Sequence, residues 1–87
     1  MRARDIVAWN VREWRTSLGL SQEALADAAG IDRTVISDVE RKAVAISLDM
    51  LDRLAVYFDA EAADLLQKPE PGRSEPKPLK AGRKPRA

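Results

Sequence analysis

The chain has 87 residues, which is room for one domain and little else. Cysteine and histidine are both absent, so disulfides, thiolate metal sites and the commonest general base and metal ligand are excluded. The N-terminus lacks the apolar stretch of a signal peptide, and the longest apolar run, residues 54–58, is far too short to span a membrane. We therefore expect a cytoplasmic protein without a metal or cofactor.

The net charge of +1 conceals two unequal parts of the chain. Residues 1–66 carry 8 positive and 12 negative side chains, whereas residues 67–87 carry 7 positive and 2 negative ones. All five prolines lie in the second part, which has almost no apolar residues and so cannot bury enough surface to fold alone. This composition predicts a folded domain over residues 1–66 and a disordered, basic tail over residues 67–87.

Apolar residues recur at spacings of three and four through the folded part, which indicates helices and no strands. In the first helix this stripe contains Val7, Val11, Trp14 and Leu18, and Gly19 provides the C-terminal cap. Each later helix follows a polar N-cap residue or a turn. These helices are predicted over residues 22–29, 33–41, 48–58 and 62–66.

The same stripes predict which side chains are buried. Asp59 is expected to adopt a positive φ in the turn before the last helix, because aspartate tolerates that region better than most residues. The side chains expected in the core are Val7, Val11, Trp14, Leu18, Leu25, Ala26, Ala29, Ile31, Ile36, Val39, Leu48, Leu51, Leu54, Ala55, Phe58, Leu65 and Leu66. The sequence thus predicts an all-α domain of five helices.

The most informative segment is QEALADAAGIDRTVISDVER, residues 22–41. Two short helices that meet at a steep angle need a small residue at their closest approach and a residue with positive φ in the turn. Ala26 and Gly30 occupy those two positions. Apolar residues also fall on both inner faces. The joint match predicts a helix-turn-helix.

This segment resembles the Cro/C1-type (XRE) helix-turn-helix family of phage repressors, bacterial regulators and antitoxins. NVREWR is similar to the first helix of that family, LSQEALA to its second, and GIDRTVISDVER to its turn and recognition helix. SLDMLDRLAVYFDAEAADLL is similar to the last two helices, so the resemblance covers roughly residues 7–66. It implies a Cro/C1 repressor-like fold.

The resemblance also implies roles for individual residues. Arg15 and Glu40 match a partly buried ion pair between the first and third helices. Where the family commonly has a glycine and a proline around the next connector, this chain has Lys42 and Ile46. The implied DNA contacts are Gln22 at the DNA backbone, Arg33, Thr34 and Asp38 at base edges, Val35 and Ser37 beside them, and Arg41 and Lys42 near phosphates.

Two functions remain open at this point. The first is a sequence-specific DNA-binding transcriptional regulator with its third helix in the major groove. Because one helix reads few base pairs, a homodimer on palindromic double-stranded DNA is then expected. The second is an antiactivator that binds and masks a transcription activator, which the acidic domain, Asp38 and a possible interface at Trp9, Val44 and Ile46 favour. An enzyme with a small-molecule substrate is not expected, because catalytic residue types are scarce.

Overall fold

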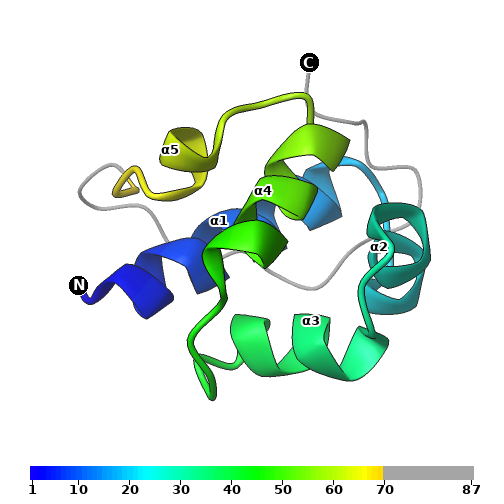
Figure 1. Ribbon diagram of the computed structural model, residues 1–87, viewed down its shortest axis with the longest axis horizontal. Coiled ribbons are helices and arrows are strands. Elements are labelled where there is room, and N and C mark those ends of the chain that lie inside the picture. The colour runs from blue at the N-terminus through cyan, green and yellow to red at the C-terminus, as the bar shows by residue number, and fades with distance from the viewer. Residues whose placement is uncertain (70–87) are drawn as a thin grey trace.

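The computed structural model describes residues 1–69, which form five helices and no strand within that range. In Figure 1, α4 lies in front of α1, with α2 at the right, α3 at the bottom and α5 at the upper left. The helices are α1 (Ala3–Ser17), α2 (Gln22–Ala29), α3 (Arg33–Glu40), α4 (Leu48–Tyr57) and α5 (Ala62–Leu65). The predicted all-α, five-helix fold is confirmed, while residues 70–87 of the predicted tail lie outside the described part.

The helix boundaries follow from local chemistry that is visible in the sequence. The side chains of Ser21, Asp32 and Ser47 each accept a hydrogen bond from a backbone N–H in the first turn of α2, α3 and α4. Gly30 ends α2 with a φ of 70°, and Asp59 follows α4 with a φ of 57°. The last three helices each end one residue earlier than predicted.

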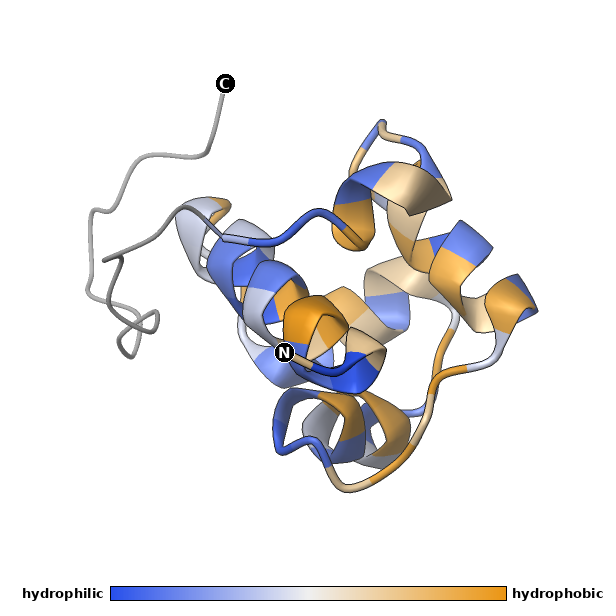
Figure 2. Cartoon of the chain, turned by 90° about the vertical axis from the view of Figure 1, so that its left-hand side faces the viewer, coloured by the Kyte–Doolittle hydropathy of each residue, from blue (hydrophilic) through white to orange (hydrophobic). Residues whose placement is uncertain are grey.

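The core is a single cluster to which every helix contributes. Figure 2 shows hydrophobic residues on the faces that the helices turn toward one another. Trp14 and Phe58 are half-buried and pack edge to face at this cluster, with ring centroids 5.2 Å apart. The buried members are Val7, Val11, Leu25, Ala26, Ile31, Ile36, Val39, Leu51, Leu54, Ala55 and Leu65.

Two residues predicted to be in the core lie at the surface instead. The side chain of Leu48 is 78% exposed and that of Leu66 is 41% exposed. Leu48 has the helical spacing of the α4 stripe, but it is the first residue of α4, and no segment within residues 1–69 covers its side chain. Leu65 takes the buried position of α5, and its neighbour Leu66 points elsewhere because successive helical residues differ by about 100° in direction.

A buried asparagine, which the sequence analysis did not single out, attaches α5 to α1. The Asn10 side-chain amide donates to the carbonyl oxygens of Leu65 at 2.8 Å and Gln67 at 2.9 Å. These bonds satisfy a polar group that would be costly to bury alone. They also hold the chain to the domain at Gln67, the first residue of the predicted tail.

Candidate nucleic-acid interface

Arg15 of α1 and Glu40 of α3 form a two-pronged ion pair in the structure. Arg15 Nε lies 2.7 Å from Glu40 Oε2, and Arg15 Nη2 lies 2.9 Å from Glu40 Oε1. The side chains are 12% and 1% exposed, respectively. Two parallel charge-assisted hydrogen bonds restrict both distance and orientation, so this pair sets how α3 lies against α1.

Glu40 has further partners that the sequence analysis did not anticipate. Gln22 Nε2, at the start of α2, donates to Glu40 Oε1 at 3.1 Å. Arg12 Nη2 donates to the Glu40 backbone carbonyl at 3.2 Å, and Arg15 Nη1 donates to the carbonyl of Leu20 at 2.8 Å. The buried carboxylate therefore connects α1, α2 and α3. Gln22 uses one amide hydrogen here and retains a second for the predicted contact with the DNA backbone.

The face of α3 opposite the core is polar. Ile36, Val39 and Glu40 are buried on the inner side. Helical spacing places Thr34, Asp38 and Arg41 together on the outer side, and we call these three residues the outward stripe. Figure 1 shows α3 along one margin of the domain. Within the outward stripe, Thr34 and Arg41 are exposed and Asp38 is half-buried.

The predicted base-reading residues lie on or beside this stripe. Arg33 and Thr34 are exposed, whereas Ser37 and Asp38 are half-buried. Val35 packs partly against the core, so its contribution to any interface is limited. The Asp32 carboxylate accepts from the backbone N–H of Thr34 at 2.8 Å and so stabilises the first turn of α3.

Within the outward stripe, Arg41 Nη2 donates to Asp38 Oδ1. The family resemblance implies separate roles for these two residues, although an acid and a base three residues apart on a helix indicate such a pair. The Asp38 side chain is 27% exposed and the Arg41 side chain is 63% exposed. The carboxylate is therefore partly neutralised, and the guanidinium lies further out.

Lys42 follows α3 with a φ of 63°. Its backbone N–H donates to the carbonyl of Val39 at 3.0 Å, and the N–H of Ala43 donates to the carbonyl of Asp38 at 2.9 Å. These bonds cap the helix in the manner usually served by glycine. Lys42 thus occupies the left-handed region at a position where the family commonly has glycine, and its side chain is exposed.

The possible protein-binding residues differ in their exposure. Ile46 packs against the core, whereas Val44 is 39% exposed. The connector between α3 and α4 is largely hydrophobic in Figure 2, and it partly covers the core through Ile46. Trp9 is half-buried, and its buried Nε1 has no hydrogen-bond partner in the described structure.

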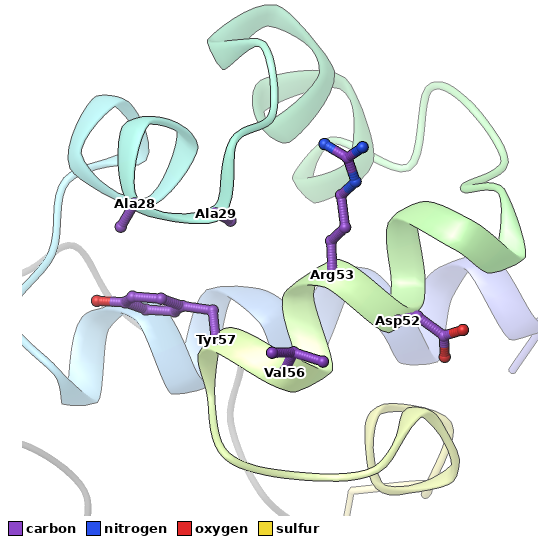
Figure 3. Close-up of a pocket in the computed structure, with 6 residues that line it drawn as sticks. All are labelled: Ala28, Ala29, Asp52, Arg53, Val56 and Tyr57. Carbon is purple, nitrogen blue, oxygen red and sulfur yellow. The ribbon is translucent and has the colours of Figure 1, made fainter.

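A shallow hollow separates α2 from α4 (Figure 3). Arg53 extends from α4 toward the turn that follows α2, where its Nη1 donates to the carbonyl of Gly30 at 2.9 Å. This bond links α4 to the turn of the helix-turn-helix. The hollow is lined by Ala28, Ala29, Asp52, Arg53, Val56 and Tyr57.

Two properties hold for residues 1–69 as a whole. No group of three or more acidic, histidine or cysteine side chains in this range could hold a metal ion. No helix in this range is long and apolar enough to cross a membrane.

The helix-turn-helix family model HTH_3 matches residues 11–65. The chain belongs to this family, which is of the Cro/C1 (XRE) type. Its members are DNA-binding transcription regulators and not enzymes. The family resemblance seen in the sequence is thereby confirmed.

Individual relatives agree with this assignment. A hypothetical transcription factor of Neisseria meningitidis is 40% identical over 67 residues, which are 77% of this chain and 63% of that protein. A crystal structure of the hypothetical transcription factor from Neisseria superposes with a TM-score of 0.74, with 78% of each chain covered. The matched part thus spans less than two thirds of that curated relative.

Two control proteins are also similar. Control protein C.SmaI of Serratia marcescens is 40% identical over 68 residues, which are 78% of this chain and 81% of that protein. The restriction-modification controller protein C.AhdI of Aeromonas hydrophila is 39% identical, with a TM-score of 0.67 and coverage of 71% of this chain and 94% of that one.

Proposed function

We propose that this protein is a sequence-specific transcriptional regulator that inserts α3 into the major groove of an operator. The observation that carries the proposal is the Glu40 network. It holds three helices together through a buried carboxylate and leaves the opposite face of α3 free for DNA. A rigidly supported helix with a polar outer face suits the major groove, which is wide enough to admit an α-helix.

The contacts divide into two kinds. Arg33 is exposed at the start of α3, and its side chain has no ion-pair partner among residues 1–69. It is suited to the O6 and N7 atoms of a guanine, with Thr34 beside it. Gln22 and Lys42 lie at the start of α2 and just after α3, where contacts with phosphates would set the register on the duplex.

We further propose that two copies bind one palindromic site. One recognition helix covers few base pairs, and a two-fold pair of helices on half-sites about one helical turn apart increases the length that is read. Similarity to two control proteins, at 39–40% identity, supports control of restriction-modification genes as the regulatory setting. A cytoplasmic location is part of this proposal, because the operator DNA that the protein would bind lies there.

The antiactivator alternative has less support. It depends partly on Asp38 as an acidic residue that contacts a partner, yet this carboxylate pairs with Arg41 in the same chain. It also relied on the connector, but Ile46 packs against the core of its own domain. The acidic balance of residues 1–66 remains in its favour, so the experiment below includes an outcome for it.

The test is selection from randomised double-stranded DNA with the full chain, followed by titration of the enriched duplex over a series of salt concentrations. We expect a palindromic consensus and an affinity that falls linearly on a log–log plot against salt concentration. The same titration is repeated with Arg33→Ala. This variant should have a lower affinity for the consensus and an almost unchanged affinity for random DNA. Failure to enrich any sequence, together with retention of a transcription activator from the source cell, would favour the alternative.

A further inference from the structure

Asp38 and Arg41 lie toward the C-terminal end of the proposed DNA-binding face, Asp38 in the last turn of α3 and Arg41 directly after it. Helical spacing places both residues on the outward stripe, on the side opposite Ile36 and Val39. The Arg41 side chain is more than twice as exposed as that of Asp38, at 63% against 27%. DNA that approaches this face would therefore meet the guanidinium before the carboxylate.

The pairing leaves Arg41 with unused donors in a restricted orientation. A guanidinium carries five N–H donors in one plane, and Asp38 Oδ1 accepts from Nη2. The donors that remain can still offer two parallel hydrogen bonds, which is the pattern that the O6 and N7 atoms of guanine accept. The carboxylate restricts the plane of the guanidinium, and this restriction improves directional contacts.

A role at phosphates fits these observations less well. Two parallel bonds from a guanidinium also suit a phosphate, but a phosphate presents equivalent oxygens in several directions, so a fixed guanidinium plane discriminates less there than at the O6 and N7 atoms of guanine. Asp38 would also repel the same phosphate from close range. Nor does the pair have a large effect on folding, because exposed ion pairs three residues apart on a helix contribute little to stability. Reading one base is the role in which a carboxylate beside Arg41 is useful.

We propose that Arg41 reads a single guanine in the major groove and that Asp38 is the positioning residue that orients it. This inference rests on the proposed function, and it changes the roles implied by the family resemblance. Arg41 moves from the phosphates to a base edge, and Asp38 acts through Arg41 instead of contacting a base itself.

The experiment repeats the selection from randomised duplex DNA with the wild type and with Asp38→Asn, Arg41→Lys and Arg41→Ala. Arg41→Lys keeps the charge but loses the planar fork. We expect both Arg41 variants to lose a guanine preference of about 5- to 150-fold at one position. Asp38→Asn should weaken the same preference while raising affinity for random DNA. Asp38→Glu, which restores a carboxylate within reach of Arg41, should recover most of it.

A double variant tests whether Asp38 acts through Arg41. In the Arg41→Ala background, Asp38→Asn should have no further effect on base preference, because the group that it orients is gone. Asp52→Asn is the matched control, since it removes an exposed carboxylate from α4 and should leave every base preference unchanged. Melting temperatures of all variants, measured in parallel, separate a loss of orientation from a loss of folding.

Each result bears on the inference separately from the proposed function. Failure of the wild-type protein to enrich any sequence would refute the proposed function itself. A wild-type consensus whose single-position preferences survive both Asp38→Asn and Arg41→Lys would overturn only the role of this pair. A cytosine preference that disappears with Asp38→Asn even in the Arg41→Ala background would show that Asp38 contacts a base directly, which also overturns it.

Discussion

Replacing Lys42 by glycine should stabilise the domain while weakening its binding to DNA. The backbone of Lys42 has a φ of 63° and completes the hydrogen bonds that end α3. An L-residue in this left-handed region costs about 1–2 kcal/mol. Glycine removes that cost but makes the unfolded chain more flexible, which offsets about 0.4–1 kcal/mol. At mid-range values of about 1.5 and 0.7 kcal/mol for these two terms, we expect a net gain of about 0.5–1 kcal/mol in the free energy of unfolding.

Thermal unfolding followed by circular dichroism measures the first effect. For a domain of this size a gain of 1 kcal/mol raises the melting temperature by about 4–8 °C, so Lys42→Gly should raise it by about 2–8 °C. The same variant loses one proposed phosphate contact, which should reduce the salt slope of DNA binding by about 0.9. Stability and affinity should therefore change in opposite directions.

Asp59→Gly is the matched control, because Asp59 also follows a helix with a positive φ, here 57°. It should raise the melting temperature less, since aspartate tolerates this region better than lysine, and it should leave the salt slope unchanged. A lower melting temperature for Lys42→Gly would refute the account of backbone strain. An unchanged salt slope would remove Lys42 from the proposed interface.

The remaining predictions concern the Glu40 network, base reading and the core. Arg15→Ala leaves the buried Glu40 carboxylate without its main partner. It should therefore lower the free energy of unfolding, measured by urea titration, by about 3–5 kcal/mol. A loss below about 1 kcal/mol would show that the pair is dispensable for folding. Arg33→Ala should cost about 1–3 kcal/mol on the selected operator, and an equal loss on random DNA would argue against base reading. Leu54→Ala should lower the free energy of unfolding by about 2–5 kcal/mol. Leu48→Ala should change it by no more than about 0.5 kcal/mol, because the Leu48 side chain is 78% exposed. Similar losses for the two variants would contradict the assigned burial.

Much of the fold could be predicted because the signals that set it are local. Ser21, Asp32 and Ser47 cap their helices through bonds to residues two or three positions ahead, and Gly30 permits the turn at a φ of 70°. Apolar spacing then assigns an inner face to each helix. Family resemblance added the Arg15–Glu40 pair, which spacing and propensity alone would not have connected.

The helices, their caps and most of their buried faces could therefore be predicted from local patterns alone, since each depends on neighbours within about one turn. The tertiary structure decided which ends of those faces are covered, as the exposed Leu48 shows. It also decided the polar contacts between distant segments. Asn10 bonds to carbonyls 55 and 57 residues away, and Gln22 bonds to Glu40 across 18 residues. Such contacts depend on how the helices pack in space, which no local pattern encodes.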